Sequence, residues 1–293
     1  MKVLMQKSNP QKTIYKRQSQ RKPGLESKMD PPPVFMNVFP GCNKLAGKKC
    51  IITGGDSGIG RAVAVTYAKE GAEVAIVYLK EEEKDARITA SIIEDVYKRN
   101  CLLVPANISE ETECLRAISK IIKEFKNIHV LVNNAGTHYE TDDFLKISTS
   151  QLLQTFTTNV FSMFWITKAV LPYMKKGGSI INTTSVTAYR GSGSLIDYSS
   201  TKGAIVSFTR SLSANLIAKG IRVNGIAPGP VWTPLITSTF SQQKVSTFGT
   251  DTPMKRPGQP IEISPAYVFL ASEDASYISG QIIHINGGEI VNG

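Results

Sequence analysis

The chain has 293 residues, 41% of them hydrophobic, which is enough to bury the core of one large α/β domain. No stretch approaches the roughly 18 apolar residues that cross a bilayer, and four cysteines without a C-x-x-C pair, beside three histidines, form no zinc-site pattern. The net charge of +10 is uneven, because residues 1–22 hold seven basic and no acidic residues, so nucleic-acid binding by the rest of the chain is not expected.

Residues 1–47 are predicted to form a basic, proline-containing leader that is partly disordered. Pro31-Pro32-Pro33 and Lys22-Pro23-Gly24 favour extended backbone over helix. A solvated tail is the simplest interpretation of residues 1–22, and a basic arm for an acidic partner or an organelle-targeting segment are the alternatives. Because the N-terminus has no apolar signal region and the cysteines fit buried free thiols, we expect a cytoplasmic protein without membrane attachment.

From Lys48 onward, short β-rich runs alternate with helical patterns. The expected strands are Cys50–Thr53, Glu73–Tyr78, Leu102–Pro105, His129–Val132, Ser179–Thr183, Arg222–Ala227 and Gln281–Ile285. The expected helices include Gly58–Glu70, Ser109–Phe125, Thr149–Lys175, Tyr198–Lys219 and Ile261–Ala271. This alternation predicts one Rossmann-type α/β domain over residues 48–293, with a doubly wound parallel sheet of about seven strands flanked by helices.

A glycine-rich turn, Thr53-Gly54-Gly55-Asp56-Ser57-Gly58-Ile59-Gly60, joins the first expected strand to the first helix. Its glycines permit a tight turn, close approach of a pyrophosphate and close helix packing, while the helix N-terminus offers unpaired N–H groups. We therefore predict a dinucleotide site here, with a purely structural turn as the alternative. The candidate cofactor-binding residues are Gly54, Asp56, Ser57, Gly58, Ile59 and Gly60.

The end of the second expected strand bears on the choice between NAD and NADP. Tyr78-Leu79-Lys80 is followed by glutamates at 81–83, and no acidic residue occupies the position that usually bonds the ribose hydroxyls. Lys80 can meet a 2′-phosphate, whereas Asp56 and the glutamates oppose one. NAD(H) is favoured and NADP(H) stays open, since the glutamate run equally fits a solvated helix start.

Tyr198 and Lys202 lie four residues apart, on one face of an expected helix. A neighbouring ammonium stabilises a phenolate, so Lys202 is predicted to lower the pKa of Tyr198 and make it a proton donor or acceptor. A surface helix pair is the alternative for these two residues alone. Ser185 follows an expected strand and can bond a substrate oxygen, while Asn159 inside a long helix can bend it and position a water near Lys202.

Several motifs occur in one order and at suitable spacings, namely Thr53–Gly60, Asn133–Gly136, Asn159, Ser185, Tyr198–Lys202 and Pro228–Thr233. Together they resemble the short-chain dehydrogenase/reductase family over about residues 45–293. The resemblance implies a catalytic tetrad of Asn159, Ser185, Tyr198 and Lys202, and hydride transfer between nicotinamide and an alcohol or carbonyl. The further cofactor contacts that it implies are Tyr78, Leu79, Asn107, Ile108, Asn134, Ala135, Gly136, Tyr198, Lys202, Pro228, Gly229, Val231 and Thr233.

Lys22–Ser27 and Gly55–Ser57 are similar to the bacterial subgroup of glucose/ribitol dehydrogenase-like general-stress oxidoreductases. Asn107-Ile108 departs from the family, which usually has an acidic residue before the apolar one that contacts the adenine. The resemblance also implies a homotetramer, with the segment Ile285–Gly293 at a subunit interface. The apolar residues in Phe161–Val170 fit either such an interface or the monomer core.

The irregular segment Trp232–Gln259 is expected to form a lid, because it is long and rich in proline. Its mixture of Thr, Ser, Phe240, Phe248 and Lys255 suggests a small or medium, partly polar substrate. Two other functions stay open. One is a cofactor-binding regulator without turnover, and the other is a lyase or epimerase with bound NAD, although such relatives usually carry a longer substrate domain.

Overall fold

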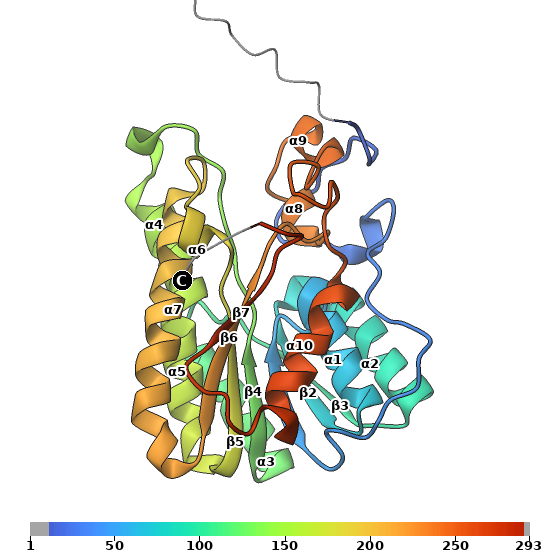
Figure 1. Ribbon diagram of the computed structural model, residues 1–293, viewed down its shortest axis with the longest axis vertical. Helices are drawn as coiled ribbons and strands as arrows, with labels where there is room; N and C mark the ends of the chain where they lie inside the picture. The colour runs from blue at the N-terminus through green and yellow to red at the C-terminus, as the bar shows by residue number, and fades with distance from the viewer. Residues whose placement is uncertain (1–11, 290–293) are drawn as a thin grey trace, which may run out of the picture.

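The computed structural model describes residues 12–289 and has one parallel seven-stranded sheet at its centre (Figure 1). The strand order is β3-β2-β1-β4-β5-β6-β7, and every neighbouring pair is parallel. The strands are β1 (Lys49–Thr53), β2 (Glu73–Tyr78), β3 (Cys101–Pro105), β4 (Ile128–Asn133), β5 (Met174–Thr183), β6 (Arg222–Pro228) and β7 (Ile282–Ile285). The order reverses beside β1, as in a doubly wound sheet, so the predicted fold class is confirmed.

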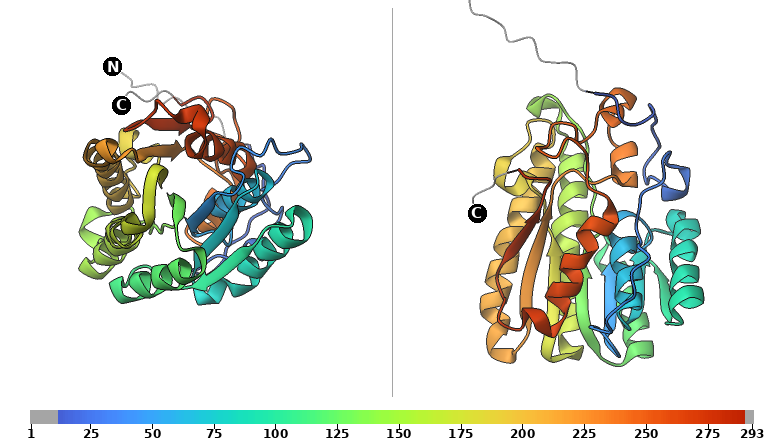
Figure 2. Two further views of the ribbon diagram at one scale, coloured as in Figure 1. Left: turned by 90° about the horizontal axis from the view of Figure 1, so that it is seen from below. Right: turned by 45° about the vertical axis from the view of Figure 1, so that its right-hand side comes forward.

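Helices cover both faces of the sheet, as the view from below in Figure 2 shows. They are α1 (Gly58–Lys69), α2 (Glu83–Tyr97), α3 (Glu111–Phe125), α4 (Thr149–Phe156), α5 (Ser162–Val170), α6 (Thr187–Arg190), α7 (Ile196–Leu216), α8 (Pro234–Thr237), α9 (Gln242–Ser246) and α10 (Pro260–Ala271). Apolar side chains of α1, α2 and α10 pack in one core layer, and those of α3, α5 and α7 in the other. Buried on both faces, the strands need the near-continuous apolar runs that they have.

The expected helix Thr149–Lys175 is wrong in its interior and at its end. A π-helical turn, Thr157–Phe161, separates α4 from α5, and a 3₁₀ turn, Leu171–Tyr173, ends the helical run. Met174 already pairs with Ile128 in the sheet, so Lys175 lies in β5. The expected lid is also more regular than predicted, since it contains α8 and α9.

The leader, defined as residues 1–47, is described from residue 12 and runs along α1 and α10 to the start of β1 (Figure 1). Backbone N–H groups of the leader tie it to the body: Ile14 N donates to the backbone Ser246 O at 2.9 Å, and Val34 N donates to the side-chain Gln259 Oε1 at 2.9 Å. Near its end, Glu70 Oε2 accepts from Cys42 N at 2.9 Å. The leader is therefore in contact with the lid, α10 and α1.

The cysteines are free thiols, but their expected burial is wrong for Cys42, which is exposed on the leader. Across residues 12–289, the helices are too short or too polar to cross a membrane. That same part of the chain gathers no group of three or more His, Cys, Asp or Glu side chains that could hold a metal. The expected interface segment Ile285–Gly293 lies within the described residues only as far as Glu289.

Candidate active site

A cavity of about 560 Å³ opens at the carboxyl ends of the strands. This is the edge at which open parallel sheets bind ligands, next to the reversal of strand order. Residues from the glycine turn, the ends of β2, β4, β5 and β6, helix α7, the lid and the leader all line it. Of the predicted site residues, all line this one cavity except Gly60 and Asn159.

The glycine turn has the backbone that a close approach requires. Gly54 and Gly58 have φ of +65° and +52°, in the left-handed region where a side chain would be strained. A Cβ on Gly60 would overlap the carbonyl of Gly54, so Gly60 allows α1 to pack against the turn without itself reaching the cavity. Asn134 ties the end of β4 to the same turn by donating from Nδ2 to Thr53 O at 3.0 Å.

The end of the cavity beside β2 and β3 is acidic. Asp56 and Glu82 line it together with Tyr78, and Tyr78 donates its hydroxyl hydrogen to Glu83 Oε2 at 2.5 Å. Asp56 is 2% exposed, and its Oδ2 has no hydrogen-bond partner within residues 12–289. Burial raises the pKa of Asp56 to about 6 and that of Glu82 to about 9. Lys80 is exposed outside the cavity, so the expected option of a 2′-phosphate contact from it is not supported.

Asn107 and Ile108 also line this end of the cavity. Asn107 Oδ1 accepts from Ser109 N at 3.1 Å and from Ser109 Oγ at 2.9 Å. The Asn107 side chain therefore caps its own loop with its oxygen, and its Nδ2 donates one hydrogen to Glu110 Oε1 at 3.4 Å, which leaves the second Nδ2 hydrogen for a ligand.

Opposite the acidic end, Tyr198 and Lys202 project from α7 toward Ser185 at the end of β5. Lys202 Nζ donates to Thr183 O at 2.8 Å and lies 5.3 Å from the centre of the Tyr198 ring. Ser185 Oγ accepts from the backbone N of Thr187 at 3.2 Å and from its hydroxyl at 3.1 Å. The predicted proton-transfer residue, its lysine and the oxyanion donor are thus brought together.

The pKa balance of the Tyr198–Lys202 pair differs from the expectation. Desolvation by the surrounding protein raises the pKa of Tyr198 to about 12, opposed by a hydrogen bond to Ser185, although its ring stays open to the cavity. Burial lowers the pKa of Lys202 to about 7. The expected lowering of the Tyr198 pKa by Lys202 is not found in the chain alone, where desolvation dominates and only the hydrogen bond to Ser185 opposes it.

Asn159 is fully buried in the π-helical turn, so a solvent-facing amide is excluded. Its Oδ1 accepts from Thr137 N at 2.8 Å, and its Nδ2 donates to Thr137 O at 2.9 Å and to Thr201 Oγ1 at 3.1 Å. A Cβ on Gly136 would lie 3.3 Å from Asn159 Oδ1 and 3.6 Å from Lys202 Nζ. Asn159 therefore does not line the cavity itself, but its hydrogen bonds hold Thr137, which lines the cavity.

Many residues that line the cavity were not among the candidates from the sequence, and His138 and Lys22 are two of them. His138 is 3% exposed and meets Tyr198 edge-on, with ring centres 5.0 Å apart. Burial lowers its pKa well below the ordinary value, so its ring is neutral. Lys22 of the leader is the other. The Lys22-Pro23-Gly24 motif indicated extended backbone, but nothing in the sequence placed it beside Tyr139 and Thr239.

Comparison with known proteins gives consistent results. A family model described as "Enoyl-(Acyl carrier protein) reductase" matches residues 54–289. General stress protein 39 of Bacillus subtilis (strain 168) is 49% identical, over 97% of this chain and 99% of its own. The glucose and ribitol dehydrogenase of Daucus carota is 48% identical, over 92% of this chain and 95% of its own. The solved structure of a short-chain dehydrogenase from Burkholderia cenocepacia J2315 in complex with NADP has a TM-score of 0.78 and 26% identity, over 84% of this chain and 98% of its own.

Proposed function

The chain belongs to the short-chain dehydrogenase/reductase family of NAD(P)-dependent oxidoreductases, and from this premise we propose that it moves a hydride between NAD(H) and an alcohol or carbonyl through Asn159, Ser185, Tyr198 and Lys202. One observation carries the proposal. Ser185, Tyr198 and Lys202 line the same cavity as the glycine turn, which lies at its other side.

The residues present fit a dinucleotide. The positive φ of Gly54 and Gly58 leaves the turn without side chains where a pyrophosphate would approach, and a Cβ at Gly58 would crowd Thr233 at 3.1 Å. The unpartnered Asp56 Oδ2 supplies an acceptor at the acidic end. The residues that would hold the dinucleotide are the candidate cofactor residues that line the cavity at the carboxyl ends of the strands. When bound, the nicotinamide supplies or receives the hydride.

In carbonyl reduction, Tyr198 gives its phenolic proton to the developing alkoxide oxygen. Its raised pKa means that the phenol is fully protonated at neutral pH. Ser185 stabilises the same oxygen by a hydrogen bond. As an ammonium, Lys202 stabilises the phenolate that proton transfer leaves on Tyr198. Asn159 Oδ1 accepts one hydrogen bond, from Thr137 N, and keeps its second lone pair for a water beside Lys202.

Absorbance of the reduced nicotinamide tests this proposal. Purified protein is offered NADH or NADPH with panels of aldehydes, ketones, sugars and quinones. Tyr198→Phe is expected to lower kcat by roughly 10²–10⁴-fold, as loss of a positioned acid requires, while the remote Tyr97→Phe changes it little. Tight cofactor binding without turnover by any substrate would instead favour a regulator that uses the fold only to bind.

We propose NAD(H) as the preferred cofactor, because Asp56 lies with Glu82 at the acidic end of the cavity, and the Asp56 carboxylate, ionised near neutral pH, repels a 2′-phosphate. Fluorescence titration is expected to give a lower Kd for NADH than for NADPH. Glu82→Gln together with Asp56→Asn should raise the affinity for NADPH while that for NADH falls or stays level. Tighter NADPH binding by the unchanged chain would contradict the preference.

A cytoplasmic homotetramer is part of the proposal. Phe161, at the end of the π-helical turn, and Phe164, in α5, are exposed by 40% and 52% respectively, so this stretch offers apolar surface to a partner subunit. Light scattering after size exclusion is expected to give four times the mass of the chain, and Phe164→Glu is expected to reduce it.

A further inference from the structure

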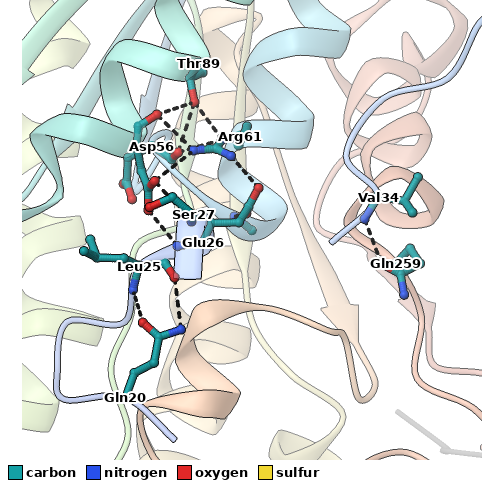
Figure 3. A network of polar contacts seen from close by, with 11 residues as sticks. Gln20, Leu25, Glu26, Ser27, Val34, Asp56, Arg61, Thr89 and Gln259 are labelled. Carbon is teal, nitrogen blue, oxygen red and sulfur yellow. Dashed lines mark hydrogen bonds and ion pairs between the residues drawn. The ribbon is translucent and has the colours of Figure 1, made fainter. Parts of the chain in front are cut away.

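The leader is fixed to the body on both sides of Lys22. Before it, Gln20 N donates to Thr237 O of α8 at 2.8 Å. The Gln20 side chain also closes the loop around Lys22, since Oε1 accepts from Leu25 N at 2.8 Å and Nε2 donates to Leu25 O at 3.0 Å (Figure 3). The three residues Lys22, Pro23 and Gly24 all line the cavity.

After Lys22, the anchor is Glu26, which is 2% exposed. Its carboxylate accepts from Gly58 N at 2.6 Å and pairs with Arg61 at 2.5 Å, and its own N–H donates to Asp85 Oδ2 at 2.6 Å (Figure 3). Charge-assisted hydrogen bonds in a buried site hold their groups firmly. Lys22 therefore has a defined place in the cavity wall.

Lys22 lies at the end of the cavity that holds Tyr198. Its Nζ donates to Thr239 Oγ1 at 2.8 Å and lies 4.9 Å from the centre of the Tyr139 ring. The Thr239 hydroxyl donates in turn to His138 O at 3.4 Å, and the His138 ring meets Tyr198 edge-on. A short series of contacts thus connects the ammonium to the predicted proton-transfer residue.

No carboxylate neutralises Lys22 among residues 12–289, since none lies within 4.0 Å of its Nζ. The described acidic residues that line the cavity, Asp56 and Glu82, belong to its other end. Arg190, which also lines it, already pairs with Glu289 at 3.0 Å. Lys22 is exposed to solvent, and partial burial of its side chain lowers its pKa to about 8, so it remains charged at neutral pH.

We propose that Lys22 is a specificity-determining residue that binds an anionic group, a carboxylate or a phosphate, on the carbonyl or alcohol substrate. A cation in the wall of a substrate cavity, with no carboxylate beside it, attracts an anionic group and forms charge-assisted hydrogen bonds to it. The uncharged Thr239 hydroxyl and Tyr139 ring position the ammonium without neutralising it. The inference rests on the proposed function, because it assigns the substrate class of the same site.

Paired substrates test it. With NADH, kcat/KM is measured for succinic semialdehyde against butanal, and for glyceraldehyde 3-phosphate against glyceraldehyde. Lys22→Gln is expected to raise KM for the anionic member of at least one pair by roughly 10-fold or more, and to leave the neutral members within about twofold. Lys22→Arg should retain most of the affinity, and the exposed leader variant Lys28→Gln is the matched control. The substrate pair that responds shows whether the site binds a carboxylate or a phosphate.

Equal losses on charged and neutral substrates, or no loss on either anion, would overturn the proposal. Turnover of the neutral aldehydes by the unchanged chain tests the proposed function separately. If no aldehyde is turned over, calorimetric titration with succinate and with inorganic phosphate decides. Binding that Lys22→Gln abolishes upholds the anion site, and no binding by the unchanged chain refutes it. A melting temperature of Lys22→Gln close to that of the unchanged chain excludes a merely structural role.

Discussion

At the scale of a single residue, Lys202 shows that the candidate site lowers the folding stability of the protein. Its side chain is 2% exposed, and its one hydrogen bond within residues 12–289 goes to a neutral acceptor, Thr183 O, at 2.8 Å. Burial lowers its pKa from 10.5 to about 7. Between these two pH values the unfolded chain binds this proton more readily than the folded chain, so Lys202 makes folding stability rise with pH across that window.

Replacing Lys202 by methionine is therefore expected to stabilise the protein while abolishing activity. Below pH 7 the gain is largest, roughly 2 kcal/mol or about 5 °C in Tm, after allowance for the unsatisfied Thr183 carbonyl. The gain shrinks as the pH approaches 10.5, because the lysine is then losing its proton in the unfolded chain as well, and its burial no longer lowers stability. Differential scanning calorimetry from pH 6 to 10 checks this, with the exposed Lys175→Met as control. A difference in Tm that does not change with pH would contradict it.

The residues that the sequence identified share a local signal. Tyr198 and Lys202 are one helical turn apart, and the glycine turn is a continuous motif, so spacing alone places their side chains together. His138 and Lys22 have no such signal, because only the tertiary fold brings the leader and the loop after β4 to the cavity that Tyr198 lines. Asn159 was identified for its position in a helix, whereas its hydrogen-bond partner Thr137 could be found only from the three-dimensional structure.

At the scale of elements, the π-helical turn Thr157–Phe161 explains how a helix interior reaches the cavity wall. Wider turns of this type often lie at functional sites, and here the turn contains the buried Asn159. Helical periodicity predicted one unbroken helix because an isolated π turn changes the phase of the pattern by a single residue. The strands were predicted closely, since a fully buried parallel sheet leaves short, continuous apolar runs.

Asn159→Ala is expected to destabilise the protein by roughly 1–3 kcal/mol, because it removes the partner of both the N–H and the C=O of Thr137, which is half-buried. Urea unfolding followed by circular dichroism measures the loss. Asn159→Asp should lose as much or more, since it still accepts from Thr137 N but places a charge against Thr137 O. The exposed Asn100→Ala is the control, and equal stability of Asn159→Ala and Asn100→Ala would show that the turn does not depend on this amide.

At the scale of the whole molecule, the leader packs against the lid. Tyr15 stacks on Trp232 with ring centres 3.8 Å apart, and Met29 joins the same apolar cluster. Trp232 Nε1 donates to Pro31 O at 2.9 Å. An extended, proline-rich segment has no periodicity from which packing can be read, so the sequence could not predict these contacts.

A chain that begins at Met29 is expected to be less stable than one that begins at Lys12. The shorter chain loses Tyr15 from Trp232 and Glu26 from Arg61, which leaves a buried guanidinium beside Asp85 at 3.8 Å and the Gly58 N–H without its acceptor. Breaking one partner of a buried ion pair costs roughly 3–5 kcal/mol. In a Trp165→Phe background, which leaves Trp232 as the single tryptophan, its fluorescence should shift to longer wavelength as water reaches the ring. Glu26→Gln in the full chain keeps an acceptor for Gly58 and should lose less stability than Glu26→Ala. Equal melting temperatures and emission maxima for the two truncated chains would mean that the contacts of residues 12–28 contribute no net stability, and that the lid holds its place without them.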